Sequence, residues 1–198
     1  MKNALLILLF AASALAQDAA KIEKRIDEIR YQAFSKRYEA NSKADREYRA
    51  AIATTLQFAD RAEVYLLDFS IGKDFAYKPK DEDKVFPIRP YKSETKILKT
   101  ATVPAKELPA WRAAVTKMVT SDKEGGGAFC HYPIHGLRIY AGTKLLFETS
   151  ICWACRNYYF DYDGQHEWVS LTDDSDDLSK LLHDFMPIPE AEMKRFPK

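Results

Sequence analysis

Residues 130–155 decide the fold of this chain, and they read CHYPIHGLRIYAGTKLLFETSICWAC. Two runs rich in apolar and β-branched residues, 137–140 and 144–152, are separated here only by the loop AGT at 141–143. So short a connection forces the two runs to pair as neighbouring antiparallel strands. The stretch therefore predicts a β-hairpin that carries cysteines and histidines at its open end.

A two-residue turn at 142–143 would set the register of this hairpin. Continued along both strands, the register places Cys155 opposite Cys130, and Cys152 opposite Pro133. Proline cannot donate a ladder hydrogen bond, so we expect the pairing to fray at Pro133 and allow the register to slip. All three sulfur atoms are nevertheless expected near the same end of the hairpin.

The first interpretation of this cluster is a structural zinc site. Three thiolates and one imidazole form the tetrahedral sulfur and nitrogen set that Zn²⁺ prefers, with C-x-x-C as one arm. The predicted ligands are Cys130, His135, Cys152 and Cys155. His131 and Arg138 are expected to lie beside the site rather than to bind the metal. Such a closed site would stabilise the sheet and would not turn over a substrate.

Two other interpretations of the three cysteines stay open. A structural disulfide could join Cys130 to Cys152 or to Cys155 and leave one buried free thiol. Alternatively, Cys152 and Cys155 could form a redox pair, because a C-x-x-C arrangement lowers a thiol pKa. Redox pairs of this kind normally open a helix, whereas residues 156–159 predict another strand.

The pattern C-x-x-P-x-H-G-x-R at 130–138, followed by a short hairpin and I-C-x-x-C at 151–155, resembles a pattern in small exported bacterial proteins of uncharacterised function. The strand EVYLLD at 63–68 is also similar. The resemblance implies that the cluster is a family feature, and it implies no particular activity.

The N-terminus predicts export. Lys2 supplies a positive charge, residues 4–13 carry no charge, and ALA at 14–16 is an A-x-A cleavage site. These three features in this order are typical of a secretory signal peptide. We expect cleavage after Ala16 and a secreted or periplasmic product, whose thiols tend to pair or to bind metal in an oxidising compartment.

A charged helical arm is expected to follow the signal peptide. Apolar residues spaced four, three and four apart form a narrow stripe on one side of it, namely Ile22, Ile26, Ile29 and Ala33. A stripe of this width suits pairing between helices, so the arm is a candidate surface for a homodimer. The expected organisation is a signal peptide at 1–16, the arm at 17–60, an α+β domain at 61–189 and a tail at 190–198.

The domain itself is expected to be α+β, with a mainly antiparallel sheet and two flanking helices. Besides the hairpin, the predicted strands cover 62–69, 95–103, 157–162 and 167–171. Pro104 and Pro109 bracket the start of one predicted helix, which ends near Thr120. Its inward face is expected to carry Trp111, Val115, Met118 and Val119. The other is capped by Ser175 and turns inward Leu178, Leu181, Leu182 and Phe185. The lysine- and proline-containing stretch 72–96 is predicted to be a long surface excursion.

Composition narrows the class of function. The 198 residues include 30 basic and 29 acidic side chains, a net charge of +1. This balance gives no broad basic surface for nucleic acid or an anionic membrane, and no later segment is apolar enough to predict a membrane span. The acidic stretch 161–167 lacks the spacing of a calcium loop and predicts a hairpin turn.

No motif in the sequence indicates catalysis. The chain has no G-x-S-x-G, no H-E-x-x-H and no phosphate-binding glycine loop. For His166 and His183 the sequence indicates no obvious acidic or thiol partner. We therefore expect a binding or structural protein of unknown ligand rather than an enzyme. The alternative is a thiol-disulfide exchange protein that uses Cys152 and Cys155.

Overall fold

The computed structural model describes residues 21, 24–25, 28, 31–32, 43–68, 78–88, 93–123, 130–162 and 165–190. The chain divides into two compact units, residues 1–45 and 46–198. In the first unit every described residue is helical, as expected for the arm. The predicted signal peptide, the stripe of the arm and most of the tail lie outside the described residues.

The second unit is built on a seven-stranded sheet in the order β2-β3-β1-β4-β5-β6-β7. Every neighbouring pair is antiparallel. The strands are β1 (Arg61–Leu67), β2 (Val85–Ile88), β3 (Ser93–Thr102), β4 (His135–Ala141), β5 (Lys144–Cys152), β6 (Asn157–Tyr162) and β7 (Gln165–Ser170). This architecture confirms the predicted α+β class with its mainly antiparallel sheet.

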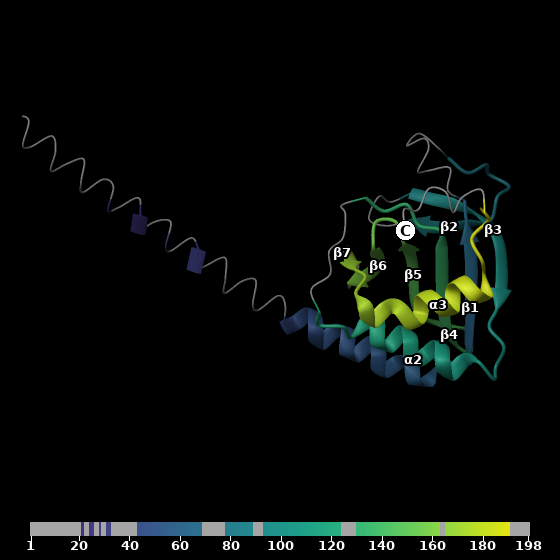
Figure 1. Ribbon diagram of the computed structural model, residues 1–198, viewed down its shortest axis with the longest axis horizontal. Coiled ribbons are helices and arrows are strands. Elements are labelled where there is room, and N and C mark those ends of the chain that lie inside the picture. The colour runs from purple at the N-terminus through teal and green to yellow at the C-terminus, as the bar shows by residue number, and fades with distance from the viewer. Residues whose placement is uncertain are drawn as a thin grey trace, which may run out of the picture. The chain divides into compact units, whose positions relative to one another are not determined.

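Helices cover one face of this sheet (Figure 1). They are the helix over residues 46–55, continued by the 3₁₀ turn η1 (Leu56–Phe58), then α2 (Leu108–Val119) and α3 (Asp176–Phe185). Pro109 lies in the first turn of α2, where its missing N–H costs nothing. The inward residues predicted for α2 are all buried, and those of α3 are buried or half-buried. The second unit begins at Arg46 and so includes residues 46–60, which the sequence prediction assigned to the arm.

Strand β2 was not predicted, because residues 85–88 were assigned to the surface excursion. In the structure they pair with β3, and Phe86 and Ile88 are fully buried. Strand β2 is at the edge of the sheet, where Pro87 can be accommodated without breaking a central ladder. The proline that argued against a strand is thus consistent with an edge position.

The hairpin register holds only near its turn. Ala141 faces Lys144 and Tyr140 faces Leu145 as predicted, but Ile139 faces Phe147. A β-bulge at this point leaves Leu146 as the extra residue and shifts all later pairs by one. The predicted opposition of Cys152 and Pro133 is therefore displaced by one residue.

The start of α3 also differs in detail from the prediction. The 3₁₀ turn η3 (Asp173–Ser175) precedes the helix, and Thr172 is its N-cap. The Thr172 hydroxyl accepts from the Asp174 N–H, and the Ser175 hydroxyl accepts from the Thr172 N–H. Ser175 therefore acts as the second member of a capping box rather than as the N-cap whose side chain caps α3.

Candidate functional site

A disulfide joins Cys130 to Cys155, with a Cα–Cα separation of 6.0 Å. Cys152 is a buried free thiol at the end of β5. This is one of the two pairings that the disulfide interpretation allowed. The bond ties the segment before β4 to the turn between β5 and β6, over residues 153–156.

The four predicted zinc ligands do not form a ligand set in this structure. Two of them, Cys130 and Cys155, are bonded to each other and so offer no thiolate. Both ring nitrogens of His135 are engaged in hydrogen bonds. Across the part of the chain that the structure describes, no group of three or more His, Cys, Asp or Glu side chains could hold a metal ion.

The C-x-x-C pair is likewise not the bonded pair. Burial raises the pKa of the Cys152 thiol, so its neutral form is favoured. The Cys152 Sγ accepts a hydrogen bond from the Cys155 N–H at 3.2 Å. This sulfur is part of the packing of the turn, which is an unfavourable setting for a nucleophile.

His135 links the turn to the end of α3. Its Nε2–H donates to the Met186 carbonyl at 2.7 Å, and its Nδ1 accepts from the Trp153 indole N–H at 2.8 Å. These two partners fix one neutral tautomer, because a carbonyl can only accept and an indole N–H can only donate. Burial lowers the pKa of His135 to about 4, and the ring is therefore uncharged at neutral pH.

A second buried network surrounds His131. The Asn157 amide donates to the Cys130 carbonyl at 2.7 Å, which leaves the Asn157 Oδ1 to accept from the His131 Nδ1–H at 2.8 Å. The His131 Nε2 then accepts from the Ser150 hydroxyl at 2.8 Å. The order serine, histidine, asparagine matches a nucleophilic triad, but the first two residues are 0% exposed and the third 2%. With the serine closed off from substrate, the network acts as buried support for the disulfide segment.

Arg138, predicted to neighbour the cluster, has other partners. Its Nε donates to the Glu148 carboxylate at 2.7 Å, and its guanidinium lies 4.7 Å from the centre of the Phe86 ring. None of these residues belongs to the cysteine cluster. Arg138 instead stabilises the middle of the sheet.

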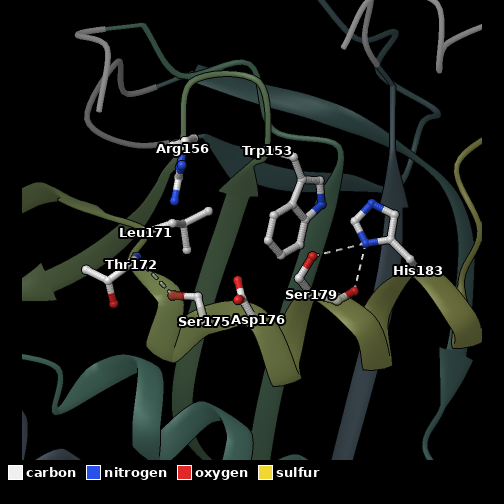
Figure 2. Close-up of a pocket in the computed structure, with 8 residues that line it drawn as sticks. All are labelled: Trp153, Arg156, Leu171, Thr172, Ser175, Asp176, Ser179 and His183. Atoms are coloured by element: carbon white, nitrogen blue, oxygen red, sulfur yellow. Dashed lines mark hydrogen bonds between the residues drawn. The ribbon is translucent and has the colours of Figure 1, made fainter. Parts of the chain in front are cut away.

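A pocket of about 320 Å³ lies between the turn at 153–156 and α3 (Figure 2). Its walls combine an aromatic ring, two charged groups of opposite sign, an imidazole and three hydroxyls. The lining residues are Trp153, Arg156, Leu171, Thr172, Ser175, Asp176, Ser179 and His183.

Arg156 enters this pocket from a strained backbone. With φ at 51°, it is the one non-glycine residue in the described part of the chain that has a positive φ. The Arg156 N–H donates to the Trp153 carbonyl at 3.3 Å, and its own carbonyl accepts from the Leu171 N–H at 2.7 Å. The left-handed conformation costs an L-residue about 1–2 kcal/mol, and these bonds hold it in place.

The charged groups of the pocket differ from their neighbours in having no ion-pair partner among the described residues. Asp174 pairs with Lys123 at 2.8 Å, and Asp177 pairs with Lys117 at 2.8 Å. Among the described side chains, no ion pair involves Arg156 or Asp176. In Figure 2 Arg156 points down from the turn and Asp176 points up from α3, with Leu171 between them in this view and Trp153 to one side.

His183 completes the wall beside Trp153. Its Nδ1–H donates to the Ser179 carbonyl at 2.7 Å, so the Nε2 of the neutral ring is an acceptor. The His183 ring centre is 5.1 Å from that of Trp153 and 5.5 Å from that of His135. The buried cluster and the pocket therefore meet at Trp153.

No functional role of the pocket residues of α3 was predicted from the sequence. Asp176, Ser179 and His183 are spaced three and four apart, which places them on one side of a helix. That spacing is the signal that could have found them. For Arg156 no equivalent signal exists, because nothing in the local sequence marks a left-handed residue.

No protein-family model, no curated protein and no solved structure matches this chain. In the described part of the chain, no helix is both long and apolar enough to cross a membrane.

Proposed function

We propose that this protein is an exported binding protein that captures a small carboxylate-bearing ligand in the pocket between the turn at 153–156 and α3. The observation that carries the proposal is Arg156, a cation without an ion-pair partner among the described residues that points into a pocket (Figure 2). A guanidinium presents a planar fork of donors that matches the two oxygens of a carboxylate.

The size and lining of the pocket support a small ligand. A volume of about 320 Å³ is at the lower end of the range for small-molecule sites, roughly 300–1,000 Å³. Trp153 supplies an apolar wall, and the hydroxyl of Ser179 and the imidazole of His183 supply polar contacts. One aromatic wall with a few fixed polar groups is the usual composition of such a site.

The cysteine and histidine cluster has a structural part in this proposal. The disulfide closes the base of the turn, and His135 fixes the indole of Trp153 from behind. The role that the sequence analysis gave to zinc is thus assigned to a disulfide and two neutral histidines. Zinc at the same four residues would require the disulfide to be reduced first.

A binding titration tests the proposal. Trp153 lines the pocket, so its fluorescence should change when acetate, benzoate, succinate or a free amino acid binds. Because hydrogen bonds to charged groups contribute about 1.5–3 kcal/mol, Arg156→Gln should weaken binding by about 10- to 150-fold. Trp153→Phe should abolish the fluorescence signal but not the heat of binding in calorimetry.

Arg112→Gln is the matched control, because that guanidinium bonds to the Gln57 carbonyl in the helical layer. It removes the same charge without changing the pocket. Equal affinities for wild type and Arg156→Gln, or no binding of any carboxylate tighter than about 1 mM, would refute the proposal.

A further inference from the structure

We infer that the ligand of this pocket is an amino acid with both its ammonium and its carboxylate free. The inference rests on the proposed function and adds a second recognition element to it. That element is Asp176, which faces Arg156 across the pocket (Figure 2).

The direction of Asp176 distinguishes it from the acidic residues around it. Asp174 and Asp177 both pair with lysines of the α2 region, Lys123 and Lys117. Successive helical residues are rotated by about 100°, so Asp176 lies on a different side of α3 from Asp177. Asp176 forms no ion pair with Lys117, although its charge contributes to the raised pKa of that lysine. Asp176 instead shares the face of α3 that carries Ser179 and His183.

Trp153 can bind the ammonium group of the ligand. Its indole N–H already donates to the Nδ1 of His135, so the part of Trp153 that is left to line the pocket is its aromatic ring surface. The face of an indole attracts an ammonium group within about 6 Å of the ring centre. An ammonium near this face can also reach the carboxylate of Asp176.

Charge balance then selects among ligands. A ligand with only a carboxylate would satisfy Arg156 and be repelled by Asp176. A ligand with only an ammonium would satisfy Asp176 and be repelled by Arg156. A zwitterion leaves no charge unpaired and meets no like charge, so the arrangement favours it over both singly charged analogues. The small volume restricts this class to free amino acids rather than long peptides.

Calorimetry with matched ligands tests the inference on the full mature chain. The panel contains glycine, leucine, phenylalanine and γ-aminobutyrate, with the N-acetyl form and the amide of each. Loss of either charge should weaken binding at least about tenfold, a difference of about 1.4 kcal/mol. The amino acid that binds best also reports the spacing between the two charges.

Asp176→Asn should weaken binding of the free amino acid at least about tenfold, and should leave binding of the N-acetyl form unchanged or make it tighter. Asp177→Asn is the matched control, because it removes the same charge one residue away, where the carboxylate pairs with Lys117. Both residues are exposed, and melting temperatures will establish that both variants fold.

The outcomes separate the two claims. If N-acetyl amino acids bind as tightly as free ones and Asp176→Asn changes nothing, the zwitterion inference is overturned while carboxylate binding through Arg156 stands. If no carboxylate binds, or if Arg156→Gln has no effect, both are overturned. The inference is established if the affinity falls tenfold for the N-acetyl forms and for the amides, and if Asp176→Asn lowers the affinity for the free amino acid tenfold as well.

Discussion

Acidification from about pH 8 to about pH 5 should lower the free energy of unfolding, because His131 and His135 are buried as neutral rings. Each ring has two hydrogen bonds that require the uncharged form. His131 lies between Ser150 and Asn157, and His135 lies between Trp153 and the Met186 carbonyl. Protonation would add a donor where each ring must accept, and a charge where no carboxylate of the described residues is in hydrogen-bond contact.

The magnitude follows from the two pKa values. Burial lowers the pKa of each histidine from 6.5 to about 4. Between these two values the unfolded chain binds more protons than the native state, so stability falls with falling pH. Linkage gives a loss of about 2 kcal/mol per histidine at about pH 5, or about 4 kcal/mol for the pair.

Urea unfolding under non-reducing conditions, followed by tryptophan fluorescence at several pH values, measures this loss. His131→Gln and His135→Gln should each remove about half of the decrease, whatever their stability at high pH. Ser150→Ala is the control, because it deletes a hydrogen bond to His131 but no titrating group. A stability that stays constant down to about pH 5, or equal pH slopes in wild type and both histidine variants, would refute the reasoning.

Three further predictions concern the disulfide, the sheet and the arm. Cys130→Ser should lower the free energy of unfolding by about 3.5 kcal/mol, as expected for a cross-link between residues 25 apart. A chelator should leave the stability of the wild type unchanged, and a loss of stability with chelator would instead support zinc. Gly136→Ala places a Cβ 2.8 Å from the buried Phe86 ring and should lower the free energy of unfolding by about 1–3 kcal/mol. The loss should be smaller in a Phe86→Leu background, and equal losses in both backgrounds would contradict the contact. If the arm forms a homodimer, Ile26→Asp should halve the mass measured by light scattering. A monomer mass for the wild-type protein would rule out this homodimer.

Those elements whose signal is local in the sequence were predicted. The β4–β5 hairpin follows from a three-residue loop between two apolar runs, and α2 follows from Pro109 and a regular apolar face. Strand β2 was missed because its evidence is not local: only its place at the sheet edge makes Pro87 acceptable. The β-bulge was missed for a similar reason, since Leu146 carries no mark that distinguishes it from its neighbours.

For the site, the sequence located the cluster but not its chemistry. The predicted register placed Cys130 opposite Cys155, and these two residues form the disulfide although the bulge at Leu146 shifts the actual register by one. The fate of the third sulfur depends on burial and on backbone N–H groups around Cys152, which no spacing rule supplies. The pocket was out of reach because Arg156 and Asp176 come from separate elements, and because Arg156 owes its direction to a backbone conformation unusual for an arginine.

The position of the cluster beside the pocket, rather than inside it, has a physical reason. Arg156 adopts a conformation that would relax if the turn were free, and its side chain would then leave the pocket. The disulfide fixes Cys155, the residue directly before Arg156. His135 fixes Trp153 and also bonds to the Met186 carbonyl at the end of α3. Breaking the disulfide should therefore weaken ligand binding although neither sulfur lines the pocket. Since Arg156→Gln would remove the charge without loosening the turn, the two variants separate recognition from its mechanical support.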